Sequence, residues 1–134
     1  MTLELKTITI FIFLALFQKM NSQDISGNWN WEYQDKHLSE ISLESIGNDT
    51  YQGTYCSVFY TGRKIDCSDD ETEFCISISK VSDIVFEGSF ESPSFNGNGT
   101  IRITYSILNQ NSFKLEILSS FGEYYLPHDV FFEQ

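Results

Sequence analysis

The stretch Gly27-Asn28-Trp29-Asn30-Trp31-Glu32-Tyr33 (GNWNWEY) decides the fold. Its large aromatic residues stand at every second position and polar residues fill the positions between them, which is typical of a β-strand with one buried face. The same alternation recurs along the rest of the chain, for example over residues 41–43, 84–90 and 101–107. Helical periodicity is nearly absent, so the pattern predicts an all-β protein.

Turn-forming residues separate these runs at regular intervals. They include Gly47-Asn48-Asp49, Thr61-Gly62 and Asn96-Gly97-Asn98-Gly99. The runs number about eight or nine at roughly ten-residue spacing, and such short connections make neighbours in sequence antiparallel neighbours in space. Closure removes the free edges of such a meander, and eight strands enclose a packed interior or one small ligand. We therefore predict an up-and-down antiparallel barrel, with a two-sheet β-sandwich as the alternative.

The N-terminal residues have the layout of a secretory signal. Lys6 precedes a run of about ten mostly apolar residues, 8–17, and polar residues follow. The run is too short to cross a bilayer, which takes about 20 residues. We predict a signal peptide over residues 1–22 and a single all-β domain over residues 23–134, secreted or periplasmic and without a membrane span. A first apolar strand or a membrane anchor is the alternative.

The predicted domain is strongly acidic. Residues 23–134 contain six Lys or Arg and eighteen Asp or Glu, a net charge of −12. This charge excludes a nucleic-acid partner, which clustered cations would have to bind, and favours a basic protein. The candidate partner contacts are the acidic residues of one short segment: Asp66, Asp69, Asp70, Glu71 and Glu73. The segment lacks the spacing and glycine of an EF-hand loop, so we predict no metal site and no cofactor.

Three cysteines lie in the predicted domain, so one internal disulfide leaves one thiol over. If Thr61-Gly62 forms a two-residue hairpin loop, Cys56 and Cys67 are opposite each other in a hydrogen-bonded pair. The Cα atoms of such a pair lie about 5.5 Å apart, which is within disulfide range. Cys67–Cys75 is the alternative bond and would close the acidic segment instead.

The sequence contains no recognisable catalytic motif. His37 and His128 are the only histidines, and no nucleophile motif accompanies either of them. Phosphate-binding, dinucleotide-binding, serine-hydrolase and zinc-protease motifs are all missing. We therefore expect a protein that is not an enzyme.

Gly27-Asn28-Trp29 resembles the Gly-x-Trp signature at the start of lipocalin-like (calycin) barrels. The resemblance implies structural roles for Gly27 and Trp29, with the Trp closing one end of the barrel. The stretches SGNWNWEY, GTYCSVFYTGRKIDC and GEYYLPHDVFFE also make the chain similar to small secreted proteins of Bacteroidetes and related bacteria that have no assigned activity. That similarity implies a location in the cell envelope.

Two functions fit these observations. The first is a binding module that holds a small apolar ligand, or a partner, at the mouth of the barrel. Its candidate contacts are aromatic residues on inferred inward faces: Trp31, Tyr33, Tyr55, Phe86 and Tyr105. The second is a solid-core envelope interaction protein, of the inhibitor or immunity type, that uses its acidic surface, because the many aromatic residues can also fill a small barrel completely. We expect Gly122–Pro127 to be a strap over one barrel end, or an exposed aromatic contact site.

Overall fold

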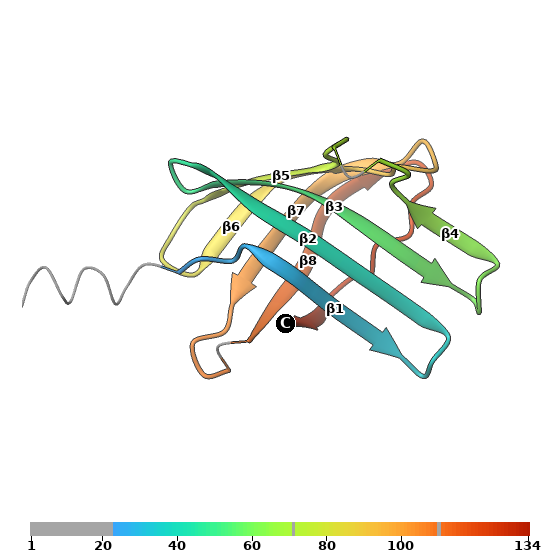
Figure 1. Ribbon diagram of the computed structural model, residues 1–134, viewed down its shortest axis with the longest axis horizontal. Helices are drawn as coiled ribbons and strands as arrows, with labels where there is room; N and C mark the ends of the chain where they lie inside the picture. The colour runs from blue at the N-terminus through green and yellow to red at the C-terminus, as the bar shows by residue number, and fades with distance from the viewer. Residues whose placement is uncertain (1–22, 71, 110) are drawn as a thin grey trace, which may run out of the picture.

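The computed structural model describes residues 23–70, 72–109 and 111–134 and contains no helix in them (Figure 1). The predicted signal peptide and Glu71 lie outside the described residues. Nine strands make up the described part of the chain: β1 Gly27–Tyr33, β2 His37–Gly47, β3 Thr50–Phe59, β4 Lys64–Cys67, β5 Ile76–Lys80, β6 Val85–Glu91, β7 Asn98–Tyr105, β8 Ser112–Phe121 and β9 Val130–Glu133.

Eight of the strands close into a barrel, and β4 is additional (Figure 1). The sheet order is β2-β1-β9-β8-β7-β6-β5-β3-β4, and a further pairing of β2 with β3 closes the ring. The first half of β3 pairs with β5 and its second half pairs with β4. All pairings are antiparallel, so the predicted meander and barrel are confirmed, and the sandwich alternative is wrong.

The first and last strands of the chain, β1 and β9, are neighbours in the ring but share only a short ladder. Among the described residues their ladder has a single pair, Asn30 with Glu133, whereas β1 pairs with β2 over its whole length. Val130, Phe131 and Phe132 of β9 pair with β8 but not with β1. We call the gap between β1 and β9 the seam.

The inward-facing side chains fill the barrel. Trp29 is 1% exposed, packs against Phe113 with ring centroids 4.6 Å apart, and donates its indole N–H to the Ile25 carbonyl at 2.9 Å. The core consists of Ile25, Trp29, Ile41, Leu43, Tyr51, Tyr55, Ile76, Ile78, Phe86, Phe90, Ile101, Ile103, Tyr105, Phe113, Leu115, Leu126 and Phe132. Burial of these apolar side chains is the main force that holds the strands together.

The β3–β4 hairpin has the predicted register. Thr61 and Gly62 both have positive φ values, 59° and 90°, as the two central residues of a type I′ turn require. Cys56 is therefore paired with Cys67, and the predicted disulfide joins them. The alternative Cys67–Cys75 bond is wrong, and Cys75 is a free thiol. The disulfide holds β4, which lies outside the ring, against β3.

Candidate binding site at the strap end of the barrel

Residues 122–129, here called the strap, cross one end of the barrel between β8 and β9. Pairing of β8 with β9 stops at Leu115–Val130. A bulge at Leu118 disturbs the outer part of β8, and Pro127 has no N–H to give to a ladder. The strap therefore leaves the sheet and places Leu126, 2% exposed, in the core. The predicted strap is confirmed.

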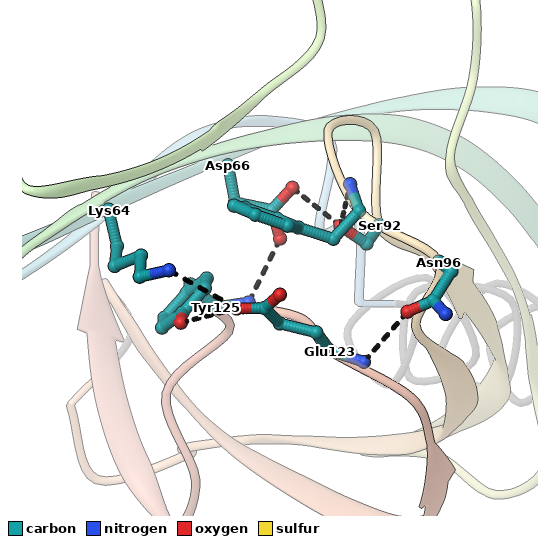
Figure 2. A network of polar contacts seen from close by, with 7 residues as sticks. Lys64, Asp66, Ser92, Asn96, Glu123 and Tyr125 are labelled. Carbon is teal, nitrogen blue, oxygen red and sulfur yellow. Dashed lines mark hydrogen bonds and ion pairs between the residues drawn. The ribbon is translucent and has the colours of Figure 1, made fainter.

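The carboxylate of Asp66, on β4, holds the strap in place through a hydrogen bond (Figure 2). Its carboxylate accepts four hydrogen bonds, and one of them comes from the strap, the backbone N–H of Tyr125 at 2.9 Å. The other donors are the Tyr55 hydroxyl at 2.6 Å, the Ser92 hydroxyl at 2.7 Å and the Ser94 N–H at 3.1 Å. Burial and the bond to Asp66 raise the pKa of Tyr55, so the phenol remains the donor.

The prediction that Asp66 contacts a partner at the surface is wrong, because the residue is 0% exposed. The hairpin register sets Asp66 opposite Ser57, and both side chains point into the barrel. A buried carboxylate needs several donors to replace its lost hydration. Four donors meet here because β3, the β6–β7 loop and the strap converge on the Asp66 carboxylate of β4.

A second set of contacts clamps the start of the strap (Figure 2). The Glu123 carboxylate accepts a hydrogen bond from the Tyr125 hydroxyl at 2.8 Å and pairs with the Lys64 ammonium at 3.4 Å. The Glu123 N–H donates to the Asn96 side-chain oxygen at 3.1 Å. Glu123, followed by Tyr125, raises the pKa of Lys64. The Lys64 ammonium also lies 5.7 Å from the Phe95 ring centroid and 5.8 Å from that of Tyr125, so aromatic rings at this end of the barrel already hold a cation.

Beneath the strap the barrel interior changes from apolar to polar. The cross-strand row Trp31, Ser39, Ser57 and Asp66 follows directly on the core row that contains Trp29, Ile41 and Tyr55. The Ser39 and Ser57 hydroxyls hydrogen-bond to each other at 2.8 Å and are buried. The half-buried Trp31 occupies the same level of the barrel as these two serines.

Next to Trp31 is an open concave surface, here called the mouth recess, with a volume of about 460 Å³. The Phe59 ring lies 6.0 Å from Trp31 and 5.7 Å from Tyr125, centroid to centroid. The recess is lined by Trp31, Phe59, Tyr60, Tyr124, Tyr125, Leu126, Pro127, His128 and Val130. The strap therefore provides more than half of its wall, and aromatic rings dominate it.

A second open concavity, the seam recess, lies between β1 and β9 and also has a volume of about 460 Å³. It is lined by Asn30, Trp31, Glu32, Phe131, Glu133 and Gln134. Trp31 lines both recesses, with its ring against Phe59 in the mouth and with the outward-facing Asn30 and Glu32 beside it in the chain. Asp35 hydrogen-bonds to Glu32 and repels its charge, which raises the pKa of Glu32.

The structure places the five predicted ligand contacts in two different environments, the open end of the barrel and the core. Trp31 lines both recesses, and Tyr33, 52% exposed, stacks on His37 at the tip of the β1–β2 hairpin beside Phe59. The three other predicted contacts fill the core and are not accessible to a ligand: Tyr55, Phe86 and Tyr105. Inward alternation identifies buried residues correctly, but it does not distinguish a core layer from an open layer.

Four aromatic residues of the site were missed as ligand contacts: Phe59, Tyr60, Tyr124 and Tyr125. Tyr60 precedes the Thr61-Gly62 turn, and the two strap tyrosines stand shortly before Pro127. The sequence feature that could have identified them is the position of aromatic residues next to turn-forming residues. What the sequence does not indicate is that both turns lie at the same end of the barrel.

The remaining acidic candidates, Asp69, Asp70 and Glu73, lie in the exposed connection between β4 and β5. Hydrogen bonds from the Thr72 side chain and backbone lower the pKa of Asp70, which is a local turn contact. Within the described part of the chain, no cluster of three His, Cys, Asp or Glu could hold a metal ion. No helix among these residues is long and apolar enough to cross a membrane.

Comparisons of the chain with protein-family models, curated proteins and solved structures gave no match. Evidence for function therefore comes from the two recesses and from the charges around them.

Proposed function

We propose that the protein is a non-enzymatic binding module, secreted or periplasmic, that holds a small apolar ligand at the mouth recess. The observation that carries the proposal is an open recess of about 460 Å³ in which aromatic side chains from β1, β3 and the strap converge. Ligand sites are typically concave, largely apolar and a few hundred Å³ in volume. Because the core side chains fill the barrel, the ligand binds over the core at the mouth and not inside it.

Contacts of the two histidines support binding and not catalysis. His128 hydrogen-bonds to the Tyr124 hydroxyl at 2.7 Å, and the Nδ1 atom of His37 accepts the Tyr60 N–H at 3.2 Å. Both imidazoles therefore bond to groups that shape the recess. The disulfide and the expected signal peptide support an oxidising compartment outside the cytoplasm.

Tryptophan fluorescence tests the proposal, because the chain has two tryptophans and Trp31 alone lines the recess. Octan-1-ol, which does not absorb at the excitation wavelength, is the probe. We expect it to shift the emission in a saturable way, and we expect Trp31→Phe, which retains the buried Trp29, to abolish the response. Tyr60→Ala should weaken binding about threefold or more.

A matched control is Phe121→Ala, which removes an exposed aromatic side chain outside the recess. It should leave octan-1-ol binding unchanged. An unsaturable response, or an equal loss in Phe121→Ala and Tyr60→Ala, would refute the mouth site.

The filled core also favours the second function, an envelope interaction protein that uses its acidic surface. Its remaining contacts are Asp69, Asp70 and Glu73, which carry charge on an exposed connection. Binding of poly-L-lysine should then fall much further when these three are replaced by Asn or Gln than when Glu40, Glu44 and Glu87 are replaced by Gln. An equal fall in both triple variants would mean that only the net charge matters.

A further inference from the structure

The tips of two hairpins meet beside the mouth recess, and two hydrogen bonds join the β1–β2 turn to the β3–β4 turn. The Tyr60 N–H donates to Nδ1 of His37 at 3.2 Å. The Thr61 N–H donates to the Lys36 carbonyl at 3.1 Å. Tyr60 lines the recess and His37 does not, so the imidazole acts on the recess through Tyr60.

The His37 imidazole also packs against rings of the site. Its centroid lies 4.8 Å from that of Phe59 and 5.1 Å from that of Tyr60, and both rings belong to the recess wall. On its other contact it stacks with Tyr33, 6.2 Å away. The imidazole therefore supports two of the rings that a ligand in the recess would touch.

The backbone of Tyr60 needs the support of its neighbours. Its φ is 55°, in the left-handed region that a bulky side chain rarely adopts, and such a conformation persists only where surrounding contacts hold it. The bond to His37 is one of these contacts, and the Tyr60 carbonyl accepts a further bond from the Arg63 N–H at 3.3 Å. Without the His37 bond, Tyr60 is freer to leave this conformation and take its ring out of the recess wall.

The two histidines near the recess respond differently to acid. Nδ1 of His37 accepts from a backbone N–H, which can only donate, so an imidazole protonated on both nitrogens cannot form this bond. Nε2 of His128 is bonded to the Tyr124 hydroxyl at 2.7 Å, and a hydroxyl can either donate or accept. The His128 bond therefore survives protonation with its direction reversed, and the His37 bond does not.

Other ionisable groups lie on the elements around His37. They are Asp35 and Lys36 of its own turn, Glu32 and Tyr33 of β1, and Tyr60, Arg63 and Lys64 of the neighbouring hairpin. Among the described residues no carboxylate forms an ion pair with His37, so none holds a proton on the imidazole. A hydrogen bond with Asp35 and the charge of that residue raise the pKa of Glu32, so this carboxylate pair is the competing source of a response to acid.

We infer that His37 makes the mouth recess sensitive to acid: protonation of its imidazole breaks the hydrogen bond from the Tyr60 N–H, releases Tyr60 from the recess wall and weakens ligand binding. The inference rests on the proposed function, because it describes the regulation of the same site. Imidazoles take up their proton between about pH 8 and pH 5, so the ligand is held at neutral pH and released as the pH falls. The backbone bond from Thr61 to Lys36 does not titrate, so the hairpin tips stay together and the change is confined to Tyr60.

Titration with octan-1-ol tests the inference, because this probe is uncharged throughout the pH range and Trp31 emission follows its binding. We expect its affinity to fall about twofold or more between about pH 7.5 and pH 5. His37→Asn places a neutral acceptor oxygen near the position of Nδ1, so this variant should bind with the same affinity at both pH values. His128→Gln is the matched control and should show the same fall as the unchanged protein.

A second measurement follows the hydrogen bond itself, without a ligand. The nuclear magnetic resonance shift of the Tyr60 amide proton reports whether that N–H has an acceptor. We expect it to change with pH in step with the His37 imidazole in the unchanged protein, and to stay constant in His37→Asn.

The outcomes separate the two proposals. Equal octan-1-ol affinity at the two pH values would overturn the switch and leave the mouth site standing. The same fall in His37→Asn as in the unchanged protein would also overturn it, and would point to Glu32 and Asp35 instead. A Tyr60 amide that does not respond to the His37 titration would have the same meaning. Failure of octan-1-ol to bind saturably at about pH 7.5 would refute the mouth site and, with it, the switch.

Discussion

Asp66 shows how one residue organises the strap end of the barrel. It brings a charge into the interior, and its four hydrogen-bond donors come from β3, the β6–β7 loop and the strap. Hydrogen bonds to a charged group are stronger than neutral ones, and a buried charge that loses its donors is costly. The position of the strap, and with it the wall of the mouth recess, therefore depends on this carboxylate.

Asp66→Asn should destabilise the protein by about 2–4 kcal/mol. The amide retains one acceptor oxygen and presents an NH₂ group where donors converge. Urea unfolding measures the change, and Asp69→Asn at an exposed position serves as the control, with an expected change within about 0.5 kcal/mol. Similar midpoints for the two variants would contradict the role of Asp66.

The free thiol of Cys75 makes stability depend on pH. Burial raises the pKa of Cys75 from 9.0 to about 11. The folded state therefore holds the thiol proton more tightly than the unfolded state. The stabilisation is fully present below about pH 9 and is lost as the pH rises toward 11.

Between pH 9 and pH 11 the Cys75→Ala variant should lose less unfolding free energy than the unchanged protein. Urea unfolding midpoints at a series of pH values measure the difference. The raised pKa of Tyr55 acts in the same direction from about pH 10 upward, and it is present in both proteins. A slope that Cys75→Ala leaves unchanged would show that the thiol is not buried in solution.

At the residue scale the sequence indicated correctly that Trp31 faces inward and that Cys56 opposes Cys67. It placed Asp66 wrongly, although the same hairpin register that pairs the cysteines also sets Asp66 opposite the buried Ser57. An acidic residue that lies next to an acidic segment in the sequence is expected to be exposed to solvent. Three of the four donors that make its burial tolerable come from residues 26 to 59 positions away in the chain, and local patterns contain no information about them.

The strap is the element that converts a barrel end into a candidate site. It forms no ladder with β8, and the side chain of Leu126 and the bond from Tyr125 to Asp66 hold it in place. Pro127 and the paired tyrosines made the segment recognisable in the sequence. Its path could not be predicted, because the path depends on the bulge at Leu118 and on contacts with β4.

Leu126→Ala should cost about 2–4 kcal/mol of unfolding free energy, since it leaves a cavity in the core beneath the strap. Leu108→Ala removes the same side chain from a position that is 97% exposed and should change stability by less than about 0.5 kcal/mol. Thermal or urea unfolding measures both. A small effect of Leu126→Ala would mean that the strap is not packed into the core.

At the scale of the whole molecule, the sequence predicted the strand content and the closure of the barrel well. Alternation and turn residues are local signals, and hairpins between consecutive strands follow from them. The seam is different, because it joins β1 to β9 across nearly the whole chain, and its single ladder pair depends on how the ring closes. The short ladder between β1 and β9 therefore appears only in the assembled fold.

The disulfide links the barrel to the strap through β4. It fixes β4 to the ring, and Asp66 of β4 accepts the hydrogen bond that holds the strap. The double variant Cys56→Ala, Cys67→Ala removes a bond across 11 positions, which should lower the unfolding free energy by about 2–3 kcal/mol. Because β4 lies outside the ring, we expect the loss to be local.

Hydrogen exchange should speed up at the Tyr125 amide and change much less at the buried Ile103 of β7. Equal acceleration at both amides would show instead that β4, the strap and the ring open as one cooperative unit.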